Sequence, residues 1–196
     1  MLNGLPEGTP VVSCGHHPLL PAGSRQTTNA DQLARALRQG GVRVYLCGHD
    51  HGFAAVLEED LQQITVGQPH AYPGWAGRLT IDDSGMRWRV VDLYAADDPQ
   101  WLRMVERTRQ LGETIARGAL ENTPYASDEG AIAWFAECFD LAVSCSLTEA
   151  SCAALLSNPN AQKWLEAQTR TVAKQWMFDL LEHCPQDPRE IRIPRD

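Results

Sequence analysis

Histidines follow two short apolar runs of the sequence at the same relative position. The tripeptide Cys-Gly-His occurs at residues 14–16 and again at residues 47–49. Further imidazoles follow each copy, since His17 comes directly after the first and His51 lies two residues after the second. Neutral imidazoles are good ligands for zinc, iron, manganese and nickel. If the two runs are neighbouring strands, His16, His49 and His51 form a candidate metal site.

The elements around these histidines are those of a strand–helix–strand unit. Residues 9–14 and 42–47 are predicted strands, and residues 30–38 a helix that begins after the N-cap Asn29 and ends at Gly40-Gly41. Such a unit predicts adjacent parallel strands whose carboxyl ends meet at one edge of a sheet. The segment after the second strand is expected to be extended, with the imidazoles of His49 and His51 on one side.

The predicted secondary structure changes from strands to helices near residue 95. Three further strands are predicted at residues 61–66, 78–81 and 87–93, with a hairpin turn at 83–85. Helices are expected from residue 97 to 184, starting at Asp98, Ser127, Ser146 and Asn158, and the last of these is expected to be one long helix. The polar tail after Pro185 is expected to be loose. The sequence therefore predicts two parts, residues 1–95 and 96–196.

Composition limits the possible partners and location. With 196 residues, 43% hydrophobic and 21% charged, the chain is expected to be globular. A formal net charge of −8, of which residues 96–196 carry −6, argues against nucleic acid or an anionic membrane as the main partner. No apolar run approaches the roughly 18 residues of a transmembrane helix. Six cysteines without a secretion signal predict a reduced, cytoplasmic chain.

Two segments match a known pattern. The sequences Gly15-His16-His17-Pro18 and Gly48-His49-Asp50-His51 resemble the last two metal-ligand motifs of the calcineurin-like metallophosphoesterases. The order of a His-x-Pro segment, a helix, a strand, the Gly-His-x-His motif and then a hairpin also agrees with that family, over roughly residues 9–93. The resemblance implies an α/β fold in which residues 1–95 are part of a metallophosphoesterase-type β-sandwich flanked by helices, followed by a helical extension over residues 96–196.

The resemblance also implies a role for each matching residue. His16 and His49 would bind the second metal of a dinuclear centre, and His51 the first. The metals would be manganese, iron, zinc or nickel, and together they would activate a water for hydrolysis of a phosphomonoester or phosphodiester. His17 would contact the substrate or support a ligand. Asp50 would orient a neighbouring imidazole or face solvent.

Three earlier motifs of that family, Asp-x-His, Gly-Asp-x-x-Asp and Gly-Asn-His, do not occur in the sequence. The chain is therefore expected to correspond to the C-terminal part of such an enzyme, to hold one metal or none, and to be inactive or weakly active in isolation. An exposed sheet face that promotes self-association is a further expectation.

Several alternatives remain open. In the loop 67–75, His70 and Tyr72 offer polar contacts to a substrate, or the loop is a rigid connection. Cys14 and Cys47 allow a Cys/His zinc site, although buried structural thiols are the simpler interpretation. The histidines could belong to a non-catalytic metal-binding remnant, or the acidic helices to a protein-interaction module.

Overall fold

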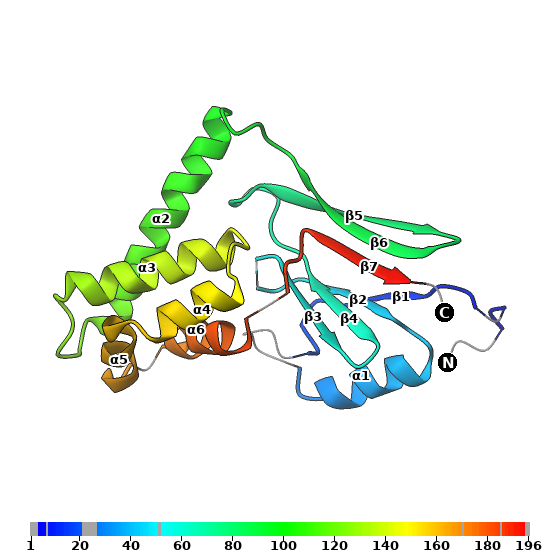
Figure 1. The fold of residues 1–196 in the computed structure, drawn as a ribbon, viewed down its shortest axis with the longest axis horizontal. Coiled ribbons are helices and arrows are strands. Elements are labelled where there is room, and N and C mark those ends of the chain that lie inside the picture. Colours follow the sequence, from blue (N-terminus) through cyan, green and yellow to red (C-terminus); the bar gives the residue numbers. More distant parts are fainter. Residues whose placement is uncertain are drawn as a thin grey trace. The chain divides into compact units, whose positions relative to one another are not determined.

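The computed structural model describes residues 4–6, 8–20, 27–50, 52–169, 171–184 and 186–194. These residues form six helices and seven strands, which is a mixed α/β architecture (Figure 1). They divide into two compact units. The sheet unit comprises Met1–Gln68, Trp75–Leu93 and Gln186–Asp196, and the helical unit comprises Pro69–Gly74 and Tyr94–Pro185. His51, one of the predicted metal ligands, lies outside the described residues.

In the first sheet of the sheet unit, the two strands that precede the histidines lie side by side. Its order is β1 (Val12–Cys14), β2 (Val44–Cys47), β4 (Leu61–Thr65) and β3 (Ala54–Glu58). Strands β1 and β2 are parallel, with Cys14 opposite Leu46, so the prediction of adjacent parallel strands is confirmed. Strand β4 is also parallel to β2, whereas β3 runs antiparallel to β4.

Helix α1 (Ala30–Gln39) lies against this sheet through a small apolar cluster. Its buried residues Ala30 and Ala34 pack with Leu19, Leu20 and the strand residues of the cluster. Asn29 precedes the helix as expected, but its side chain makes no capping hydrogen bond. The helix ends at Gly40, and Gly41 follows with φ of +75°, a conformation that glycine adopts without steric cost.

Strand β3 was not predicted, because its hairpin lacks the usual turn residues. The turn is Glu59-Asp60, and Glu59 adopts a φ of +54° that glycine or asparagine normally supplies. Arg38 of α1 stabilises this acidic turn. Its guanidinium lies 3.0 Å from a Glu58 carboxylate oxygen and 3.4 Å from one of Glu59. The turn is therefore accompanied by ion pairs to a distant residue, and it lacks the glycine or asparagine by which a hairpin turn is recognised in a sequence.

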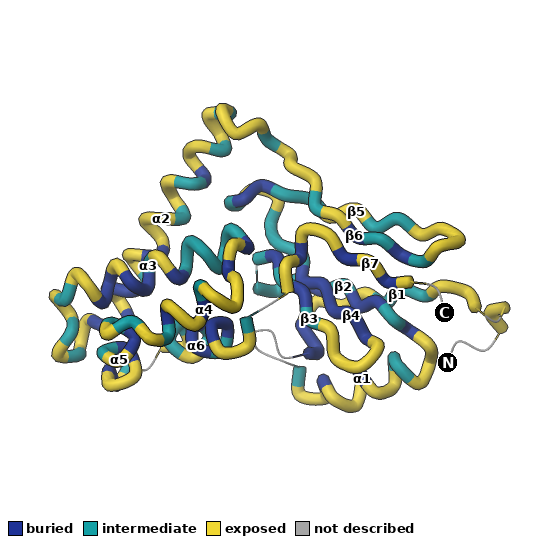
Figure 2. The backbone as a smooth tube through the Cα atoms, viewed as in Figure 1, coloured by how far each residue is buried: buried dark blue, intermediate teal, exposed yellow. Residues whose placement is uncertain are grey.

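The second sheet consists of β5 (Trp75–Asp82), β6 (Gly85–Asp92) and β7 (Glu190–Pro194), all antiparallel. The hairpin between β5 and β6 is confirmed, and Asp82 accepts hydrogen bonds from Ser84 in its turn. The expected loose tail is wrong. Residues Ile191 and Ile193 alternate with exposed residues and are buried, so this polar-looking segment is a half-buried strand (Figure 2).

The helical unit contains α2 (Pro99–Leu120), α3 (Glu129–Val143), α4 (Glu149–Leu156), α5 (Pro159–Glu166) and α6 (Val172–His183). The starts at Asp98 and Asn158 are confirmed, since both side chains accept a backbone N–H of the first turn. The N-cap of α3 is Asp128, one residue after the expected Ser127, and that of α4 is Thr148. The single long last helix is wrong, because α5 ends at Glu166 and α6 begins six residues later.

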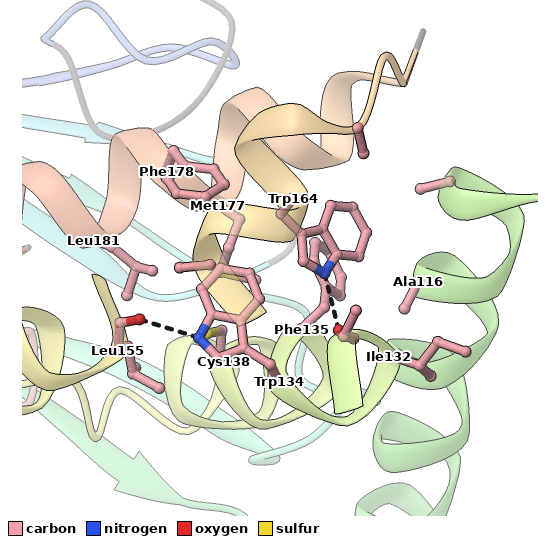
Figure 3. Packing of buried hydrophobic residues seen from close by; sticks show 14 of the residues in the cluster. Ala116, Ile132, Trp134, Phe135, Cys138, Leu155, Trp164, Met177, Phe178 and Leu181 are labelled. Atoms are coloured by element: carbon pink, nitrogen blue, oxygen red, sulfur yellow. Dashed lines mark hydrogen bonds between the residues drawn. The ribbon is translucent and has the colours of Figure 1, made fainter. Parts of the chain in front are cut away.

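Aromatic side chains fill the core of the helical unit (Figure 3). Trp164 of α5 is fully buried, stacks on Phe135 of α3 at 4.7 Å between ring centroids, and donates its indole N–H to the carbonyl of Ala131. Trp134 donates to the carbonyl of Leu155. Large buried rings whose polar atoms are paired give both apolar area and orientation. Within the described residues, no helix is long and apolar enough to cross a membrane.

Candidate metal centre

Three imidazoles meet at the carboxyl edge of the first sheet. One ring nitrogen each of His16, His17 and His49 lie within 4.8 Å of one another. The ring centroids are 4.9 Å apart for His16 and His17, 5.3 Å for His16 and His49, and 4.3 Å for His17 and His49. The convergence of His16 and His49 agrees with the expectation from the parallel strands.

The backbone of the two loops is cross-linked next to these rings. Gly15 N–H donates to the carbonyl of Leu46 at 2.9 Å, and Gly48 N–H donates to the carbonyl of His16 at 3.0 Å. The β1–β2 ladder therefore continues one step beyond both strands and holds the two histidine-bearing loops together. The metal-ligating candidates are fixed to a sheet rather than to independent loops, which favours a preformed site.

Gly15 is needed for a close approach. A Cβ atom at this position would lie 2.1 Å from the hydroxyl oxygen of Tyr45. That hydroxyl donates a hydrogen bond of 2.8 Å to the carbonyl of His17. Burial raises the pKa of the Tyr45 phenol, so the hydroxyl keeps the proton that it donates. A Cβ at Gly48, in contrast, would meet nothing closer than 3.9 Å.

The second motif turns sharply instead of remaining extended. His49 has a φ of +72°, and the N–H of Asp50 donates to the carbonyl of Gly48 at 3.0 Å across it. These are the features of a γ-turn, which is rare for residues other than glycine. The expectation of an extended backbone is therefore wrong at His49. The turn brings the His49 ring to the rings of His16 and His17.

His17 is the third member of the cluster, where the motif resemblance placed it in contact with substrate or in support of a ligand. Because His16 and His17 lie in a bend after β1, their rings do not alternate between opposite sides as they would in a strand. His51, which was expected as a ligand, is outside the described residues. Among the described residues, no carboxylate or thiol joins the group.

A buried glutamine holds the loop that follows His17. Gln63 of β4 is 1% exposed, and its side-chain oxygen accepts the N–H groups of Leu19 at 2.6 Å and of Leu20 at 2.8 Å. Its amide nitrogen donates to the carbonyl of Leu20 at 3.2 Å. Sequence reasoning missed this residue. The available signal was a glutamine pair inside an otherwise apolar strand, where a buried amide must have hydrogen-bond partners.

Of the two cysteines that precede the histidines, Cys47 is a buried structural thiol as expected, whereas Cys14 is exposed. Cys47 is buried, and its sulfur lies 3.4 Å from the Thr65 hydroxyl. Burial raises the pKa of this thiol to about 11, and the nearby Asp50 carboxylate adds to the shift. Zinc binds the thiolate form, which this environment disfavours. Neither thiol belongs to the imidazole group.

The loop residues His70 and Tyr72 belong to the helical unit. His70 is exposed, and Tyr72 packs edge-on against Trp101 at 5.9 Å between ring centroids. Burial is the main reason that the pKa of the Tyr72 phenol is raised. The structure thus gives Tyr72 a packing role within its own unit.

Three imidazoles with an open side match the ligand set of a catalytic zinc site, in which water completes the shell. The nitrogens of a tetrahedral site with Zn–N bonds of about 2.0–2.1 Å are about 3.4 Å apart, and the ring nitrogens of the three histidines lie within 4.8 Å of one another. His16 and His17 are exposed and His49 is half-buried, which leaves the site accessible to a ligand. Comparison with protein-family models and with curated proteins gives no match for this chain.

Proposed function

We propose that this chain is part of a metal-dependent phosphoesterase of the calcineurin-like class, with His16, His17 and His49 as ligands of a divalent metal ion. The observation that supports this most directly is the convergence of three imidazoles from two loops at the carboxyl ends of β1 and β2. Both loops carry the motifs whose resemblance to that class was drawn from the sequence. In this proposal the sheet unit is the metallophosphoesterase portion, and the helical unit is an appended part.

A divalent ion at this site would supply Lewis acidity and lower the pKa of a bound water. In the reaction, the water oxygen forms a bond to phosphorus and the bond to the ester oxygen breaks. The departing alcohol takes the electron pair and a proton. The imidazoles of His16, His17 and His49 would hold the ion, and the Tyr45 and Gln63 hydrogen bonds keep the His17 loop in place.

Phosphodiesterase activity tests the proposal directly. Hydrolysis of bis(4-nitrophenyl) phosphate would be measured with and without added Mn²⁺, for the unmodified protein, His49→Ala and His70→Ala. We expect slow metal-dependent turnover that is lost in His49→Ala and retained in His70→Ala, whose imidazole lies in the other unit. Turnover that is independent of metal, or equal in His49→Ala, would contradict the proposal.

A metal-binding remnant without catalysis is the second candidate. It is favoured by one observation, that the imidazole group in the described part of the chain includes no carboxylate to bridge a second ion. Stoichiometric metal that depends on His16, His17 and His49, combined with no turnover of the diester, would select this alternative.

A further inference from the structure

One face of the second sheet carries a group of four arginines. The strand register places Arg78 directly opposite Arg89, and Arg87 directly opposite Arg192. Residues paired across strands project from the same face. The opposite face holds the buried side chains of Met86, Trp88, Ile191 and Ile193, so the arginines occupy the outer face of this sheet. We call this group the arginine face.

The four arginines are only partly neutralised within the face, which carries two carboxylates, those of Glu190 and Asp82. Like charges directly opposite each other on antiparallel strands are unfavourable, and the arginine face contains two such pairs. Glu190 lies between Arg89 at 3.1 Å and Arg192 at 3.3 Å. As far as the structure describes the chain, Arg78 and Arg87 form no ion pair with any carboxylate. Asp82, at the turn end of the face, is hydrogen-bonded to Ser84, and after this bond the charge of Arg87 also helps to lower the pKa of its carboxyl.

The chemistry of the face favours a carboxylate-bearing partner. A guanidinium presents a planar set of donors that matches a carboxylate. One carboxylate oxygen of Glu190 already accepts hydrogen bonds from Arg89 and Arg192. The uncharged side chains of the face, Ala76, Thr80, Val91 and Pro194, include no aromatic ring on which a base of a single-stranded nucleic acid would stack. An acidic protein surface therefore fits better than nucleic acid.

The helical unit of the chain has a net negative charge. This unit, residues 69–74 and 94–185, contains 13 acidic and 7 basic residues. We propose that the arginine face binds the acidic helical unit of a second copy of this chain. Two reciprocal contacts of this kind would close a twofold-symmetric dimer. This inference is independent of the metal centre, which lies on the other sheet of the sheet unit.

Sedimentation velocity over a range of protein concentrations tests the proposal. We expect a dimer at about 50 mM NaCl that weakens at about 500 mM NaCl, since salt screens exposed charges. Arg78→Glu should weaken the dimer at least about tenfold, as expected for a reversed charge at an ionic contact. The matched control is Arg35→Glu, the same change at an exposed position of α1. Circular dichroism would show that both variants keep the native helix content.

Each other outcome contradicts the proposal. A monomer under all conditions, or a dimer that Arg78→Glu leaves unchanged, would show that the face does not bind a second copy. If the unmodified protein is monomeric and binds a single-stranded DNA oligonucleotide, and Arg78→Glu abolishes that binding, the face would instead be assigned to nucleic acid.

Discussion

The helical unit and the sheet unit bury different kinds of side chain. The helical unit encloses stacked rings such as Trp164 and Phe135, with indole N–H groups paired to helix carbonyls. The sheet unit has a smaller apolar cluster beneath α1 and buries polar side chains as well, among them Gln63 and Thr65. Its buried polar atoms bond to the loops and strands next to the histidines.

This difference indicates a division of roles. Apolar packing stabilises a fold but tolerates repacking, whereas a buried hydrogen bond fixes one backbone position relative to another. In the sheet unit, Gln63 and Tyr45 both bond to the backbone of residues 17–20, beside the imidazoles. We interpret the buried polar groups as the means by which the sheet unit holds the three clustered histidines in place.

The largest effect on stability is expected in the helical unit, and it should leave zinc binding by the sheet unit unchanged. Trp164→Ala removes a fully buried ring and its hydrogen bond to Ala131, and should cost about 3–5 kcal/mol. Thermal unfolding followed by circular dichroism at 222 nm would measure it. Leu165→Ala, at the neighbouring exposed position, should stay within about 0.5 kcal/mol. Zinc affinity below the melting transition should be unchanged, and a loss of zinc binding would contradict the separation of roles.

Gln63→Met should lower both the stability of the sheet unit and its affinity for zinc. It leaves the N–H groups of Leu19 and Leu20 without their acceptor, at a cost of roughly 2–3 kcal/mol. Because the same loop carries His17, zinc affinity measured by calorimetry should also fall. Gln39→Met, at the exposed end of α1, serves as the matched control. Lower stability with unchanged zinc affinity would show that Gln63 only supports packing.

The two glycines that precede the histidines should differ in their tolerance of alanine. Gly15→Ala should cost about 1–3 kcal/mol and weaken zinc binding, because the added methyl group overlaps the Tyr45 hydroxyl. Gly48→Ala should be close to neutral in both measurements, since its Cβ has space. Equal effects of the two substitutions would refute the role given to Tyr45.

The smallest effect concerns pH and the helical unit. A hydrogen bond from Lys163, and then one from the N–H of Ala131, hold the pKa of the Asp128 carboxyl below its usual 3.8. A lowered pKa in the folded state contributes stability that is present above pH 3.8 and is lost as the pH falls through the folded value. The melting temperature of Asp128→Asn should therefore be slightly below that of the unmodified protein at pH 6. The difference should shrink towards pH 3, and a constant difference would contradict this origin.

Local patterns predicted much of the fold. The parallel pairing of residues 12–14 with 44–46 followed from a strand–helix–strand pattern, and the caps Asp98 and Asn158 followed from their side chains. Elements that depend on distant partners were missed. Strand β7 is polar in isolation and becomes a strand only by pairing with β6, about a hundred residues away in the sequence. The β3–β4 hairpin depends on Arg38.

The candidate site, too, was predictable only where it follows from local sequence patterns. The meeting of His16 and His49 follows from strand topology, but the place of His17 depends on a bend and on the positive φ of His49. Neither conformation has a strong sequence signal, because a positive φ is uncommon at any residue other than glycine. The supporting hydrogen bonds of Tyr45 and Gln63 reach across 28 and 44 residues and could not be read from local spacing.

Metal stoichiometry tests the central claim most directly. After incubation with Zn²⁺ or Mn²⁺ and removal of the excess, metal per chain would be measured by elemental mass spectrometry. The unmodified protein is compared with His16→Ala, His17→Ala and His49→Ala, and with His183→Ala as an exposed control on α6. We predict about one bound ion for the unmodified protein and the control, and a large loss in each of the three variants. Equal metal content in all five proteins would contradict the assignment of this centre.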